Sequence, residues 1–225
     1  YAARTGLRLG DPMAVEPVVA FAEQAGSPFQ LRAIEALGQT QKFIQVIGPL
    51  KRLLDSRNEV VRLAAYEALA EFGPGSAIRR YRIDDQFALD VVETDRDYVI
   101  YATRTGEPRL VLFGNMPIRR PVFYCPPDEL VTISDAPKDV EPHEGHGPPK
   151  ERRPVMVYRR LPVGRRKSPP FYIPATATEL VKTLGEAPHL GIDDKPEGLG
   201  LSYSQVVGVV QGLCEKGHIP ARFVL

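Results

Sequence analysis

An internal repeat near the start constrains the fold of this chain more than any other feature. When the sequence is shifted along itself, Glu-Ala-Leu at residues 35–37 aligns with Glu-Ala-Leu at residues 67–69. The same shift aligns Leu31 with Leu63 and Pro17 with Pro49. A period of this size, a little over thirty positions, is typical of solenoids built from stacked helix pairs. The repeat therefore predicts two helix pairs within residues 1–75.

The second helix of the last pair is predicted within residues 55–73. Cap and turn residues open this segment, small and apolar residues follow at helical spacing, and Gly73-Pro74-Gly75 closes it. The spacing places Val60, Leu63, Ala64, Tyr66, Ala68 and Leu69 on the buried face, and Arg62, Glu67 and Glu71 on an outer face. The many alanines allow neighbouring helix backbones to approach closely, as a stacked array requires.

These segments resemble a known family. Residues 9–18 (Leu-Gly-Asp-Pro-Met-Ala-Val-Glu-Pro-Val) look like the opening of a short bacterial HEAT repeat, and residues 55–69 look like its second helix. The resemblance implies a helical-hairpin scaffold and says little about function, because such scaffolds serve unrelated systems. Because the first residue is Tyr1 and the first ten residues look like the end of a repeat, we expect a fragment of a longer array.

The region from 76 to 175 is predicted to be a proline-rich antiparallel β domain. Most of the 22 prolines of the chain lie after residue 107. Apolar and β-branched runs separated by short turns predict strands. The predicted strands cover 87–92, 98–103, 109–113, 121–124, 129–133 and 154–158, and extended edge structure covers 168–174. Connections this short favour antiparallel pairing.

The segment from 176 to 225 is predicted to be helical with a final strand that packs on the β domain. Thr176 with Glu179, and Ser202 with Gln205, have the spacing of capping boxes at helix starts. Residues 221–225 indicate a strand that returns to the sheet. The fold class predicted for the whole chain is α+β, with HEAT-like helical hairpins packed on an antiparallel β domain with C-terminal helices.

The sequence predicts no enzyme, metal site or cofactor. It has no G-x-S-x-G, P-loop or G-x-G-x-x-G motif. The one close histidine pair, His143 and His146, lies in a Gly/Pro segment with a spacing that does not match a helical zinc site, which favours a solvated loop. Cys125 and Cys214 are too few and too distant for a disulfide framework, and two free thiols are the favoured interpretation.

One basic segment is the candidate binding site. Residues 150–167 contain eight basic residues against one acidic residue, and aromatic residues flank them. Such a pattern can bind phosphates and stack bases, or it can be a solvated segment that protects a sheet edge or meets an acidic partner. The candidate binding residues are Arg152, Arg153, Arg159, Arg160, Arg165, Arg166, Lys167, Tyr158, Phe171 and Tyr172. The net charge of +1 disfavours nucleic acid as the partner.

A second resemblance concerns the rest of the chain. Residues 100–106 (Ile-Tyr-Ala-Thr-Arg-Thr-Gly), 112–114 (Leu-Phe-Gly), 121–124 (Pro-Val-Phe-Tyr) and 168–170 (Ser-Pro-Pro) are similar to the HEAT-associated region of bacterial flagellar P-ring-like proteins. This resemblance implies a structural role in the periplasm, although no residues match a ring-forming motif.

We therefore expect a non-enzymatic structural or protein-interaction module. Its expected partners are proteins, self-assembly included. The alternative is a polyanion- or nucleic-acid-binding module that uses the basic segment. No apolar run approaches the ~18–20 residues that a membrane-spanning helix needs.

Overall fold

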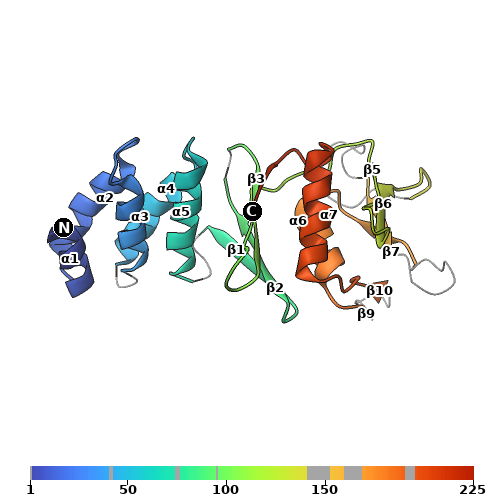
Figure 1. Ribbon diagram of the computed structural model, residues 1–225, viewed down its shortest axis with the longest axis horizontal. Coiled ribbons are helices and arrows are strands. Elements are labelled where there is room, and N and C mark those ends of the chain that lie inside the picture. The colour runs from blue at the N-terminus through green and yellow to red at the C-terminus, as the bar shows by residue number, and fades with distance from the viewer. Residues whose placement is uncertain are drawn as a thin grey trace. The chain divides into compact units, whose positions relative to one another are not determined.

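The computed structural model describes residues 2–40, 43–73, 77–94, 96–140, 153–159, 169–190 and 196–225. The chain divides into two compact units. The helical unit comprises Tyr1–Arg80 and Val92–Arg96, and the β/α unit comprises Tyr81–Val91 and Asp97–Leu225. The chain combines a run of N-terminal helices with β-sheets and later helices, so the predicted α+β class is confirmed (Figure 1).

The helical unit repeats its secondary structure at the period that the sequence predicts. A 3-10 turn precedes the first helix of each pair, at Pro12–Ala14 (η1) and at Ile44–Val46 (η2). The helices that follow these turns, α2 and α4, begin at Val15 and Ile47, and the shift that aligns Pro17 with Pro49 also aligns these starts. The α-helices are α1 (Ala2–Leu9), α2 (Val15–Glu23), α3 (Gln30–Gly38), α4 (Ile47–Leu53) and α5 (Glu59–Ala70).

Small residues bring α3 and α5 into close contact. A Cβ atom placed on Gly38 would lie 2.7 Å from Cα of Ala68, closer than real Cβ atoms come to other atoms. Ile34 and Leu37 of α3 and Leu69 of α5 are completely buried. The alanines of α5 therefore allow the close approach that the sequence predicts, and glycine is the residue that completes the contact.

The predicted division of α5 into a buried and an outer face is wrong at two positions. Arg62 was expected to face solvent and is only 4% exposed, whereas Val60 was expected to be buried and is 57% exposed. The helix begins after Asn58, whose side-chain Oδ1 accepts a hydrogen bond from N–H of Val60 at 3.0 Å. This start turns Val61 and Ala65 inward, at positions i and i+4 of one face. Arg62 follows Val61 and is covered with it.

The first sheet of the β/α unit has the strand order β1-β2-β4-β3-β11. Strand β1 was not predicted from the sequence, because three arginines interrupt its apolar alternation. The strand predicted at 221–225 does return to the sheet, as β11, and it pairs parallel with β3. The connection from β3 to β11 contains further strands and two helices, and a connection of this length allows parallel pairing. The strands are β1 (Ile78–Ile83), β2 (Phe87–Val92), β3 (Val99–Ala102), β4 (Arg109–Phe113) and β11 (Arg222–Val224).

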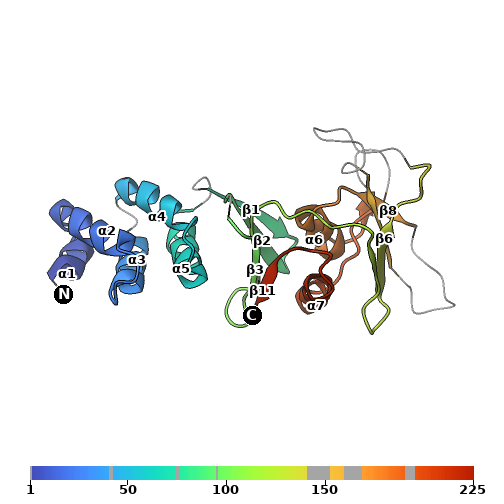
Figure 2. The ribbon, with the colours of Figure 1, turned by 90° about the horizontal axis from the view of Figure 1, so that it is seen from above.

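The second sheet is antiparallel, with the order β5-β6-β7-β8. In Figures 1 and 2, helices α6 (Ala177–Gly185) and α7 (Tyr203–Glu215) lie between the two sheets. Buried residues of both sheets and both helices form one continuous core. The strands of this sheet are β5 (Phe123–Tyr124), β6 (Val131–Asp135), β7 (Val155–Arg159) and β8 (Phe171–Ile173); β9 (His189–Leu190) and β10 (Pro196–Glu197) form a separate pair.

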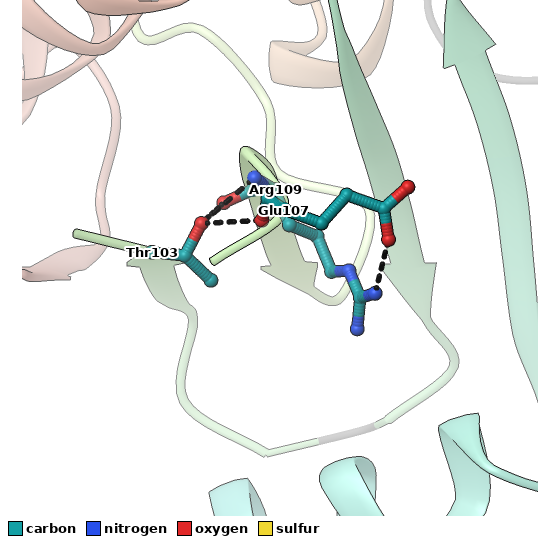
Figure 3. Close-up of polar contacts among 3 residues, drawn as sticks. All are labelled: Thr103, Glu107 and Arg109. Carbon is teal, nitrogen blue, oxygen red and sulfur yellow. Dashed lines mark hydrogen bonds and ion pairs between the residues drawn. The ribbon is translucent and has the colours of Figure 1, made fainter. Parts of the chain in front are cut away.

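The turn between β3 and β4 connects the first sheet to α7. Thr103 Oγ1 accepts a hydrogen bond from N–H of Arg109 at 2.8 Å and donates to the carbonyl of Glu107 at 3.1 Å, while the Arg109 guanidinium pairs with the Glu107 carboxylate (Figure 3). The hydroxyl of Tyr203, in the first turn of α7, reaches the carbonyls of Thr103 and Arg109 at 3.0 and 2.8 Å. The predicted turn at 104–108 thus holds α7 against the first sheet.

Candidate interaction surface

The two faces of the sheet β5-β6-β7-β8 have different environments. Ile133 of β6 and Val155 and Val157 of β7 are completely buried in the core beneath α6 and α7. The residues that alternate with them, Ser134 and Met156, lie on the opposite face and are half-buried. This second face is called the outer face below.

A row of side chains crosses the outer face over all four strands. In the strand register, Phe123 is opposite Ser134, Ser134 is opposite Met156, and Met156 is opposite Tyr172. Side chains in directly opposed positions are within contact distance of each other. The side chain of Phe123 is 71% exposed and that of Tyr172 is 38% exposed. The row therefore presents two aromatic rings and a thioether side chain on one face.

The neighbouring row contains Thr132 opposite Tyr158. Thr132 is only 2% exposed, and its hydroxyl has no hydrogen-bond partner within the part of the chain that the structure describes. Tyr158 is half-buried. The outer face is thus apolar and aromatic in character, and the polar groups in it are small.

The structure separates the binding residues that the sequence predicted. Tyr158 and Tyr172 lie on the outer face, as the register requires. Phe171 is opposite Val157 and packs against the core. Arg159 is opposite Val131, also on the inner side, and its Nη1 donates to the carbonyl of Leu199 at 2.7 Å. Phe171 and Arg159 thus lie off the outer face, and their predicted role in binding stays a prediction.

Of the other predicted binding residues, the structure describes Arg153. The backbone carbonyl of Arg153 accepts a hydrogen bond from the guanidinium of Arg120, which also donates to the carbonyl of Pro154 at 2.8 Å. The side chain of Arg153 is half-buried. Five predicted residues lie outside the described residues: Arg152, Arg160, Arg165, Arg166 and Lys167. His143 and His146 of the weighed metal site also lie outside them.

Two members of the outer face, Phe123 and Met156, were not predicted from the sequence. A signal for Met156 was present, because it alternates with Val155 and Val157 in a predicted strand. Phe123 had a weaker signal, since its strand contains only two residues and alternation cannot be recognised over that length. The strand register alone brings Phe123, Met156 and Tyr172 into one row.

Prolines protect both edges of this sheet. β5 is an edge strand with Pro121 before it and Pro126 and Pro127 after it, and β8 is an edge strand between Pro170 and Pro174. Proline has no N–H to donate to another strand, so these flanks limit edge-to-edge pairing.

No cluster of three or more metal-ligating side chains occurs among the described residues. Both cysteines have free thiols. Burial, with a smaller effect of the Glu215 charge, raises the pKa of the Cys214 thiol to about 12, which makes this thiol a poor nucleophile at neutral pH. Across the described ranges, every helix is too short or too polar to cross a membrane.

Comparison of the chain with models of protein families, with curated proteins and with solved structures found no match.

Proposed function

We propose that this chain is a non-enzymatic protein-interaction module that binds a protein partner through the outer face of the sheet β5-β6-β7-β8. The observation that carries the proposal is the row formed by exposed Phe123, half-buried Met156 and exposed Tyr172. Aromatic residues and methionine are enriched in the cores of protein interfaces. Complete burial of a Phe side chain contributes about 1.5–3 kcal/mol, so Phe123 is the strongest single anchor of this surface.

The scaffold beneath the surface supports the proposal. The opposite face of the same strands is packed into the core of the β/α unit. A rigid backbone fixes the row before a partner arrives, which lowers the entropy cost of binding. The proline-flanked edges limit pairing with a further strand, and this directs a partner to the face of the sheet.

The test begins by finding what contacts residue 123. A photo-crosslinking amino acid is placed at Phe123 and, as a control, at Leu190, which is 69% exposed and lies outside this sheet. We expect a protein to be crosslinked from position 123 and not from position 190, in the cell that produces the chain. The same partner crosslinked equally from both positions would contradict the proposal.

Calorimetry with the purified partner then measures the contribution of the surface. We expect Phe123→Ser to weaken binding at least about tenfold, which is the effect of ~1.4 kcal/mol. The matched variant Leu190→Ser should bind like the wild type. Unchanged affinity of Phe123→Ser would remove the outer face from the interface.

A second candidate function is polyanion or nucleic-acid binding, and one observation supports it. Tyr158 and Tyr172 lie on the same face, and stacking on aromatic rings is how single strands bind without sequence preference. Against it, Arg159 donates inward to Leu199. Binding of a short oligothymidylate across a salt series separates the two functions. Affinity that falls steeply with salt would support the second candidate, and affinity that is absent or flat would remove it.

The family resemblances are also carried forward as proposals. The helix pairs and their 3-10 turns, which recur at the period of the sequence repeat, support a HEAT-like interpretation of the helical unit. A role in a flagellar P-ring-like or other envelope assembly, with a periplasmic location, stays a prediction.

A further inference from the structure

A pocket of about 320 Å³ opens on the other side of β5, within the β/α unit. One wall is the loop that follows β5, with Pro126, Pro127 and Asp128, and the other wall is the first half of α7, with Ser204 and Gly208. Tyr124 also lines the pocket. Its volume lies at the lower end of the range for ligand sites, about 300–1,000 Å³, which suits one long side chain or a small molecule.

Two glycines of α7 explain why there is empty space beside one helical turn and none beside the next. At Gly212, the hydroxyl of Tyr124 occupies the position where a Cβ atom would lie, so the ring fills the space. At Gly208, one turn earlier, a Cβ atom would have no neighbour within 4 Å. A side chain at position 208 would extend into the pocket. The absence of one therefore creates the space.

The charge of the pocket favours a cation. Asp128 is exposed at the rim, and its Oδ1 accepts a hydrogen bond from N–H of Leu130 at 3.2 Å, which orients the carboxylate. Burial, followed by the negative charges of Glu215 and Asp128, raises the pKa of Tyr124. The phenol therefore stays neutral at ordinary pH, and Asp128 is the one charged residue among those that line the pocket.

We propose that this pocket binds the cationic side chain of an arginine or lysine from the protein partner. The carboxylate of Asp128 would pair with the charged end, and the Tyr124 ring and the prolines would cover the aliphatic stem. This inference rests on the proposed function only for the source of the cation. Its test uses a defined probe without the partner, so its failure leaves the test of the outer face unaffected.

The probe is the capped tripeptide acetyl-Ala-Arg-Ala-amide, titrated into the ¹⁵N-labelled full chain and followed by NMR. Its control is the same peptide with citrulline, which has the shape of arginine without the charge. We expect saturable shifts of the amide signals of Asp128, Ser204 and Gly208 with the arginine peptide and at least about tenfold weaker binding of the citrulline peptide. Equal shifts with both peptides, or shifts elsewhere, would overturn the proposal.

Variants test the two features of the pocket separately. Asp128→Asn keeps an oxygen for the N–H of Leu130 and removes the charge, so we expect at least tenfold weaker binding of the arginine peptide. Asp139→Asn, at an exposed position outside the pocket, is the charge-matched control and should bind normally. Gly208→Leu should abolish binding by filling the space, and helix propensity favours its folding. Arginine binding that survives in Asp128→Asn and in Gly208→Leu would place the site elsewhere.

One further titration identifies the source of the cation. Agmatine contains the guanidinium group and stem of arginine without a peptide backbone. We expect the tripeptide to bind more tightly, because its backbone contacts the pocket walls. Agmatine that binds as tightly as the tripeptide would overturn the assignment to a partner's side chain and assign the pocket to small amines.

Discussion

The helical unit and the β/α unit reach close packing by different routes. In the helical unit the close contact between Gly38 and Ala68 joins α3 and α5, the equivalent helices of neighbouring repeats. In the β/α unit, Tyr203 of α7 bonds to Thr103 and Arg109, which lie 100 and 94 residues earlier in the chain. Repeat units depend mainly on their neighbours, whereas a core made of distant segments depends on all of them. Substitutions should therefore have local effects in the first unit and distributed effects in the second.

The largest effect is expected at Gly38. Gly38→Leu places a side chain against the backbone of Ala68, which cannot move without separating α3 and α5. We expect a loss on the order of 3 kcal/mol in the free energy of unfolding, as for a severely overpacked core. Hydrogen exchange should accelerate in α3 and α5 and remain slow in β3 and β4. Gly48→Ala is the control, because its Cβ would meet only the end of Arg52. Equal loss of protection in both units would show that they unfold together.

The second-largest effect is expected from pH, which should change the stability of the β/α unit. The folded Cys214 thiol has a pKa of about 12 and an ordinary thiol one of 9.0. Between these values the unfolded chain releases a proton that the folded chain retains, so stability falls as pH rises from 9 toward 12. The free energy of unfolding can fall by at most about 1.4 kcal/mol per pH unit through this one group. Partial exposure of the thiol should reduce this slope to roughly half.

Urea unfolding at pH 8, 9 and 10 measures this slope. The variant Cys214→Ser should have a shallower slope than the wild type. A slope unchanged in Cys214→Ser would assign the pH dependence to other groups, of which Tyr124 is the first to examine because its pKa is also raised.

A smaller effect is expected from the bond between α7 and the first sheet. Tyr203→Phe removes the hydroxyl that donates to Thr103 and Arg109 and leaves the ring against Phe87, at a centroid distance of 5.4 Å. We expect a loss of about 1 kcal/mol in thermal or chemical unfolding. The loss should appear in exchange rates of the β3–β4 turn as well as of α7. An effect confined to α7 would contradict the distributed character of this unit.

The smallest expected effect is an increase in stability and not a loss. Thr132 has a buried hydroxyl without a hydrogen-bond partner among the described residues. Thr132→Val replaces that hydroxyl with a methyl group of similar size, so we expect stability to increase by about 0.5–1 kcal/mol. Ser134→Val on the same face, where Ser134 is half-buried, is the comparison. A destabilised Thr132→Val would indicate that the hydroxyl has a partner, such as an ordered water.

The candidate site could be predicted from the sequence only in part. Aromatic residues in two strands drew attention to Tyr158 and Tyr172, and both lie on the outer face. Alternation divides a strand into two faces without deciding which face the rest of the chain covers. For this reason the sequence did not show that Phe171 packs against the core or that Arg159 bonds to Leu199, on the other side of the sheet. Phe123 and Met156 join the row only through the strand register, which depends on residues far apart in the sequence.

By itself, the sequence determined the features that depend on near neighbours. The period of the helical repeat, the start of α6 at Thr176 and the start of α7 at Ser202 were all correct, since period and capping are local properties. The tertiary structure decided the rest: the burial of Arg62, the parallel pairing of β11, the exposed row and the open space at Gly208. Each of these depends on which distant surface covers a side chain, and the energy of that covering appears only when the segments are assembled.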